Sequence, residues 1–76
     1  MILKLFDKRY GWRFIDKVVD VMTQKTVNSE QNRTVNIIDI ELQGREGIKS
    51  LSFSTEDGIS DVYLLNDEGK TIERIN

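Results

Sequence analysis

WRFIDKVVDVMTQ, residues 12–24, decides the fold, because it is compatible with two different structures. At 100° per residue its core apolar side chains fall within about 160° of one another, which is typical of an amphipathic helix. Its residue types favour a strand, since seven of the thirteen are aromatic or β-branched. A helix here would also lack a good N-cap, because no Ser, Thr, Asp or Asn lies at that position before Phe14 and Gly11 is a weak substitute. We predict one long bent strand or two short strands here, with a helix at 12–24 as the alternative.

The flanking segments also read as strands. Ile, Val and Thr make up 20 of the 76 residues, and alanine, the best helix former, is absent. Apolar or alternating runs between glycine-marked turns predict strands at 2–7, 35–43, 48–55, 60–65 and 71–75. The predicted fold class is all-β: a single domain over residues 1–76, formed as a small antiparallel barrel or sandwich of about six strands. The alternative is an α+β domain with one helix at about 12–24 packed on an antiparallel sheet.

The alternation within these strands predicts which side chains are buried. One face of 35–43 carries Ile38, Ile40 and Leu42, and the core face of 48–55 carries Leu51 and Phe53. The opposite faces still hold apolar residues, namely Val35, Ile37, Tyr63 and Leu65. In a single open sheet these four would need a cover. A core this small rarely supplies more than about 3–5 kcal/mol. Both observations predict a homo-oligomer.

Several function classes are excluded by composition. The chain has no cysteine and no histidine, so it can form no disulfide, no usual zinc site and no Ser-His-Asp or Cys-His triad. The net charge of −2 argues against long nucleic acid as a partner. The charge is uneven, with a net +3 over residues 1–17 and −5 over residues 56–68, and such a dipole can steer partners.

No signal peptide and no apolar run of membrane-spanning length is visible in the sequence. We therefore expect a cytoplasmic protein with no membrane partner.

The predicted binding site is the N-terminal hairpin, where bases and aromatic residues interleave. Such a surface could stack a planar ring and neutralise a phosphate group. The predicted ligand-binding residues are Lys4, Lys8, Arg9, Tyr10, Trp12 and Arg13. The competing interpretation places Phe6, Phe14 and Trp12 in the core and leaves the bases as a solvated rim.

The acidic residues favour no catalytic or metal site. The turn carboxylates match no EF-hand loop and suit turn chemistry and solubility; they are Asp57, Asp61, Asp67 and Glu68. Asp39 and Glu41 alternate on one strand and are typical of a solvated face. We predict a protein that is not an enzyme and that has no cofactor and no catalytic or metal-binding residue.

Two segments carry a resemblance, GWRFID at residues 11–16 and YLLNDEGKTIERI at residues 63–75. In these the chain resembles the small, uncharacterised β-rich accessory proteins of bacteriophages. The resemblance implies a protein that binds a host factor or sequesters a small signalling molecule, and it transfers no ligand or catalytic residue. From the residues we expect a non-enzymatic binding module for a small anionic ligand such as a nucleotide signal. The alternative is a protein-binding inhibitor or assembly subunit that uses a sheet edge or an apolar face.

Overall fold

A computed structural model describes the backbone of all 76 residues and every side chain except that of Asn28. It contains seven strands and one 3-10 turn, η1. The strands are β1 Ile2–Asp7, β2 Gly11–Ile15, β3 Val18–Asn28, β4 Arg33–Gly44, β5 Gly47–Ser54, β6 Ile59–Leu65 and β7 Thr71–Arg74, with η1 at Thr55–Asp57 between β5 and β6. The described backbone contains no α-helix and no helix able to cross a membrane.

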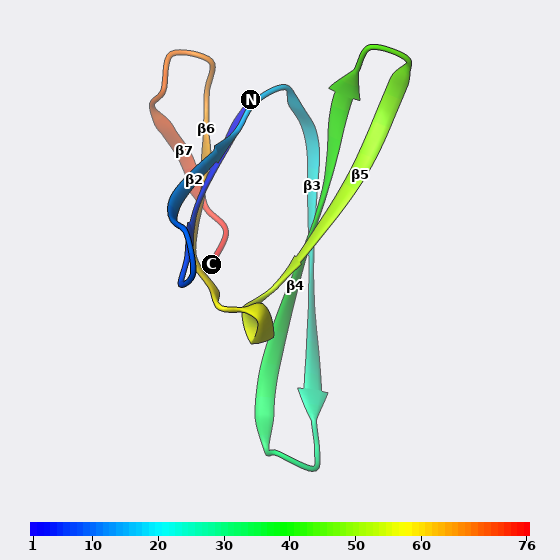
Figure 1. The fold of residues 1–76 in the computed structure, drawn as a ribbon, viewed down its shortest axis with the longest axis vertical. Coiled ribbons are helices and arrows are strands. Elements are labelled where there is room, and N and C mark those ends of the chain that lie inside the picture. The colour runs from blue at the N-terminus through cyan, green and yellow to red at the C-terminus, as the bar shows by residue number, and fades with distance from the viewer.

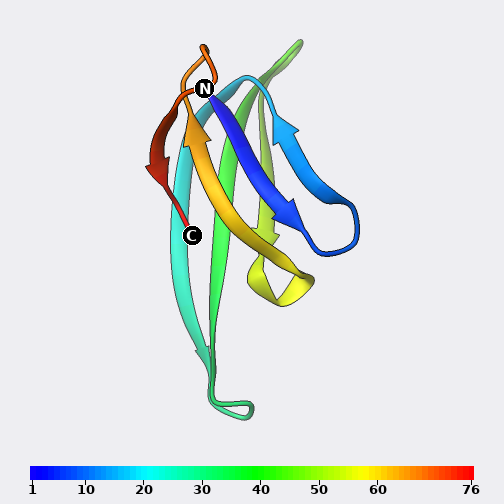
Figure 2. The same cartoon turned by 90° about the vertical axis from the view of Figure 1, so that its left-hand side faces the viewer.

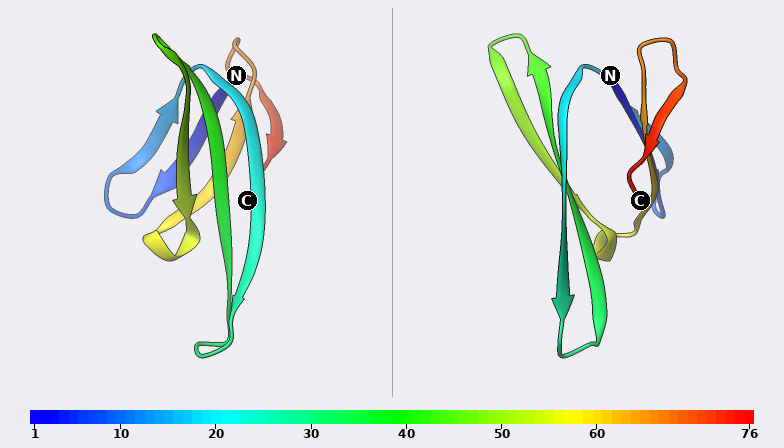
Figure 3. Two further views of the ribbon diagram at one scale, coloured as in Figure 1. Left: turned by 90° about the vertical axis from the view of Figure 1, so that its right-hand side faces the viewer. Right: turned by 180° about the vertical axis from the view of Figure 1, so that it is seen from behind.

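The strands form two antiparallel sheets that face each other (Figure 1). One sheet has four strands in the order β2-β1-β6-β7, and the other has three in the order β3-β4-β5. Seen from one side, the four-stranded sheet lies in front of the three-stranded sheet (Figure 2). The views from the other side and from behind show the same two layers (Figure 3). The all-β, antiparallel prediction is confirmed, and the structure is a pair of open sheets rather than a closed barrel.

The helix alternative at 12–24 is wrong, and so is the count of six strands. The segment divides into β2 and β3 at Asp16 and Lys17. Lys17 takes a positive φ of 61°, and its amide donates to the Asp16 carboxylate at 2.8 Å. The Lys17 carbonyl accepts the Gln43 amide at 3.0 Å. This corner carries the chain from one sheet to the other, which adds the seventh strand.

The core lies between the two sheets and is aliphatic. It consists of Leu3, Leu5, Ile59, Val62 and Leu64 from the four-stranded sheet and Val18, Ile38 and Ile40 from the three-stranded sheet. Leu42 and Phe53 pack against this cluster, as their strand positions predict. Leu51 is 43% exposed, contrary to the prediction. It lies on β5, an edge strand that diverges from the other sheet toward the β4–β5 turn (Figure 1).

The second apolar face expected for a single sheet is mostly covered within the chain. Val35 and Leu65 are buried, while Ile37 and Tyr63 are half-buried. The turn η1 lies beside β4 near Val35, since the neighbouring Asn36 amide donates to Thr55 Oγ1 at 3.1 Å. These four residues alone therefore do not require an oligomer.

The far end of the β3–β4 hairpin extends beyond both sheets (Figure 1). Strand β5 pairs with β4 only from Ile37 onward, so residues 25–28 and 33–36 pair with each other alone. We call these residues and the connecting turn the ribbon. The molecule measures 40 × 24 × 22 Å along its principal axes, and the ribbon contributes to the longest dimension.

Candidate functional site

The outer face of the four-stranded sheet carries a cluster of aromatic rings around one lysine. Alternation along β1 and β2 sends Leu3 and Leu5 into the core and turns Lys4, Phe6, Trp12 and Phe14 outward. Strand β6 adds Tyr63, which pairs directly with Lys4. We call this set, Lys4, Phe6, Trp12, Phe14 and Tyr63, the aromatic face.

Lys4 lies at the centre of the aromatic face. Its ammonium nitrogen is 4.6 Å from the centre of the Trp12 ring, 5.9 Å from that of Phe14 and 6.0 Å from that of Tyr63. Each distance is within the range of a cation–π interaction, which contributes about 0.5–1 kcal/mol at an exposed site. These contacts hold the lysine among the rings.

The aromatic face presents apolar surface to solvent. The Trp12 side chain is 48% exposed and Phe14 is 63% exposed. The Phe6 ring meets the Trp12 ring edge to face, with the ring centres 5.3 Å apart, and this contact orients the indole. The competing interpretation is therefore wrong in placing Trp12 and Phe14 in the core. The aliphatic residues fill the space between the sheets, so these rings remain outside.

The six predicted ligand-binding residues fall into separate groups. Lys4 and Trp12 belong to the aromatic face. Arg9 lies in the β1–β2 turn and Arg13 lies on the edge strand β2, and both contact the buried carboxylate of Asp7 at 3.4 Å. Two of the expected anion-binding bases are thus already paired with an acid.

Lys8 and Tyr10 form the β1–β2 turn. The Lys8 amide donates to the Gly58 carbonyl at 2.9 Å, and the Tyr10 amide donates to the Asp7 carbonyl at 3.2 Å. The Tyr10 ring is exposed and lies beneath the Arg9 guanidinium, 5.3 Å away. The cation–π contacts of the aromatic face involve neither Lys8 nor Tyr10, so the structure does not bring all six together.

Two residues from the other half of the chain extend the site. Tyr63 is the third aromatic ring near the Lys4 ammonium, after Trp12 and Phe14. The Arg74 guanidinium lies 5.6 Å from the Tyr63 ring. Arg74 also contacts the Asp61 carboxylate at 3.5 Å. The alternation of Val62, Tyr63 and Leu64 signals that Tyr63 faces away from the core. The sequence does not reveal that β6 pairs with β1.

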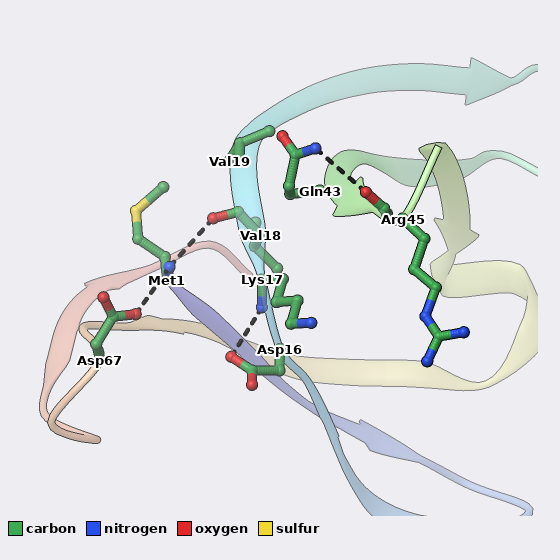
Figure 4. Close-up of a pocket in the computed structure, with 9 residues that line it drawn as sticks. Met1, Asp16, Lys17, Val18, Val19, Gln43, Arg45 and Asp67 are labelled. Atoms are coloured by element: carbon green, nitrogen blue, oxygen red, sulfur yellow. Dashed lines mark hydrogen bonds and ion pairs between the residues drawn. The ribbon is translucent and has the colours of Figure 1, made fainter. Parts of the chain in front are cut away.

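A cavity lies elsewhere, at the end of the molecule where β2 passes into β3 (Figure 4). Its volume is about 410 Å³, and none of the six predicted residues lines it. It combines bases and acids: Lys17, Arg45 and the Met1 amine with Asp16 and Asp67. The Met1 amine is paired with Asp67 at 3.1 Å and donates to the Val18 carbonyl at 3.1 Å. The mixed charge gives this cavity no clear preference for an anion.

The described side chains contain no group of three or more metal-ligating residues placed to hold an ion. A scan of protein-family models, a search of curated proteins and a search of solved structures each found no match to this chain. The functional argument therefore depends on the geometry of the site.

Proposed function

We propose that this protein is a non-enzymatic binding module that recognises another protein through its aromatic face. The observation that carries the proposal is the exposure of Trp12 and Phe14 around the Lys4 ammonium. Aromatic side chains are enriched at the centres of protein interfaces, where truncating one commonly costs about 2 kcal/mol or more. Three of the six aromatic residues, Tyr10, Trp12 and Phe14, are exposed, and a partner that covered Trp12 and Phe14 would remove apolar surface from water.

The shape of the site supports a macromolecular partner over a small ligand. Small molecules are usually held in concave pockets that bury most of their surface. The three cavities of about 410, 270 and 260 Å³ are lined by no residue of the aromatic face. The rings project from one side of a sheet, a surface that suits a flat partner.

The non-enzymatic part of the proposal rests on side-chain chemistry. The sequence has neither histidine nor cysteine, which removes the most common general base and the strongest nucleophile. The aromatic face itself carries one lysine and no carboxylate, so it offers no acid–base pair.

Site-specific photocrosslinking in the cells that make the protein tests this proposal. A photoreactive phenylalanine at position 14 is expected to give a covalent protein adduct. The same group at position 27, which is also exposed but lies on the ribbon, is the control. The adduct should disappear when Trp12→Ala is added. Equal yields at the two positions, or a yield at 14 that Trp12→Ala leaves unchanged, would refute the proposal.

A second candidate is the capture of a nucleotide, and the position of Lys4 among three rings favours it. A base could stack on Trp12 or Phe14 while its phosphate meets the ammonium group. Trp12 is the only tryptophan, so its fluorescence reports directly on this site. Titration with nucleotides should quench it, and Lys4→Met should weaken the binding while Lys25→Met should not. An unchanged signal at millimolar nucleotide would exclude this candidate.

A further inference from the structure

We propose that the partner of the aromatic face is a second copy of this chain, which docks through the outer face of its three-stranded sheet. The inference rests on the proposed function, because it names the protein that the aromatic face binds. Two such contacts per molecule would assemble copies head to tail.

The outer face of the three-stranded sheet is acidic. Register pairs Asp20 with Glu41 and Met22 with Asp39 across β3 and β4, so these four side chains share one face. Ser50 lies beside Glu41 on β5. We call these five residues, Asp20, Met22, Asp39, Glu41 and Ser50, the acidic face. They line a hollow of about 260 Å³.

The charges of the acidic face are not neutralised by the described side chains. Among the described residues, Asp20, Asp39 and Glu41 take part in no ion pair. The Asp20 carboxylate accepts the Val21 amide at 2.9 Å, which leaves its charge in place. Three carboxylates therefore surround the hollow without a base.

The two faces are complementary in charge and in apolar contact. Lys4 places its ammonium group at the centre of the aromatic face, and a lysine ammonium is a compact cation that suits a hollow lined by carboxylates. Met22 is 59% exposed at the rim of that hollow, where its thioether can pack against the rings of the incoming copy.

Pairing of like faces is disfavoured by the same charges. Two aromatic faces in contact would place Lys4 against Lys4 around a two-fold axis, and two acidic faces would bring six carboxylates together. Like charges brought together across an interface are costly. Charge therefore selects the pairing of unlike faces.

The position of the two faces makes the contact open-ended. They lie on the outer sides of opposite layers of the molecule (Figures 2 and 3). A copy bound through its aromatic face still exposes its acidic face. Such heterologous contacts extend into a filament, or into a ring if the rotation closes.

Mixing two variants, each with one damaged face, tests the inference. Trp12→Ala damages the aromatic face and Asp39→Lys damages the acidic face. The wild-type mass in analytical ultracentrifugation should rise with concentration, and each variant alone should associate at least about tenfold more weakly. An equimolar mixture should form a heterodimer and nothing larger, because it contains one intact face of each kind. Asp57→Lys, on exposed η1, is the charge control and should associate like the wild type.

The possible results separate this inference from the proposed function. A wild-type monomer at several hundred micromolar, or single variants that still form dimers, would overturn the head-to-tail contact. If the monomer is found and position 14 still crosslinks a different protein in a Trp12-dependent manner, the proposed function stands and the inference fails. Circular dichroism of each variant must match the wild type, and Phe14→Ala with Glu41→Lys supplies a second pair if either variant fails to fold.

Discussion

Asp7 is the only buried charged side chain among the described residues, and it holds the β1–β2 turn together. Its carboxylate accepts the Arg9 amide at 2.9 Å and contacts the guanidinium groups of Arg9 and Arg13 at 3.4 Å. The Arg13 guanidinium also lies 5.8 Å from the Phe53 ring, on β5 of the other sheet. One carboxylate thus links a turn, an edge strand and the facing layer.

Replacing this carboxylate is expected to destabilise the protein in a pH-dependent way. The Arg9 amide hydrogen bond, and then the two arginines, hold the pKa of Asp7 below its usual range despite its burial. A carboxyl group with a lowered pKa in the folded state stabilises above its unfolded pKa, and this contribution is lost as the pH falls. Asp7→Asn should therefore lower Tm by several degrees at pH 7.

The difference in Tm should shrink as the pH falls below about 4, because the Asp7 carboxyl of the unfolded wild-type chain begins to bind a proton there while that of the folded protein stays ionised. Thermal denaturation between pH 3 and pH 7 measures this, with Asp57→Asn as an exposed control. A Tm difference that stays constant down to pH 3 would show that Asp7 does not contribute through its charge.

At the scale of the elements, most strands could be predicted because alternation and glycine turns are local signals. A break inside residues 12–24 is one of the two strand arrangements expected, but its position at Asp16 and Lys17 could not be predicted. Glycine is the usual residue for positive φ, whereas a lysine, Lys17, adopts it here. The conformation is held by the hydrogen bond from the distant Gln43 amide to the Lys17 carbonyl. Local residue propensities cannot indicate this hydrogen bond, because the two residues are 26 positions apart in the sequence.

The turn between β5 and β6 depends on Gly58. It has a φ of 87°, and a Cβ added there would lie 3.1 Å from the Lys8 Cβ. Gly69 has a similar φ of 84° with open space around it. In both Gly→Ala variants the free energy of unfolding should fall by about 1–2 kcal/mol, because alanine is strained in the left-handed conformation. Urea denaturation should show a larger fall for Gly58→Ala than for Gly69→Ala, because the added Cβ at position 58 also displaces the β1–β2 turn. An equal fall in the free energy of unfolding would contradict the role of this contact.

The ribbon should be the least protected paired segment of the sheets. Two strands alone are marginally stable in water, and residues 25–28 and 33–36 have no third strand beside them. Hydrogen exchange should therefore be faster at the paired amides of the ribbon than at those around Ile38 and Ile40. Uniform protection along β3 and β4 would mean that a partner or another copy covers the ribbon.

At the scale of the whole molecule, the candidate site could be only partly predicted. The aromatic and basic character of residues 4–14 is visible in the sequence, and it identifies Lys4 and Trp12. The expected roles of Arg9 and Arg13 depend on where Asp7 lies, and alternation alone does not show that an acid would be buried beside them. Tyr63 joins the site because β6 pairs with β1, and that register depends on the arrangement of both sheets.

Self-association should respond to salt. The proposed contact pairs Lys4 with carboxylates on the acidic face, and dissolved ions screen such pairs while leaving apolar contacts in place. The association constant should fall when NaCl is raised from 50 to about 500 mM, and the fall should be smaller for Lys4→Met. Ultracentrifugation across this range measures both. An association that strengthens with salt would indicate an apolar contact without charge pairing.

The ribbon has a further consequence for such an assembly. It runs along the strands, whereas copies would stack perpendicular to the sheets, so every ribbon would project from the side of the stack. Because packed sheets lie about 10 Å apart, a two-layered copy adds about 20 Å per step. A filament of this protein would carry a row of ribbons at that spacing, each bearing Lys25 and Arg33. A single molecule presents one ribbon, whereas the filament would present a periodic surface for multivalent binding.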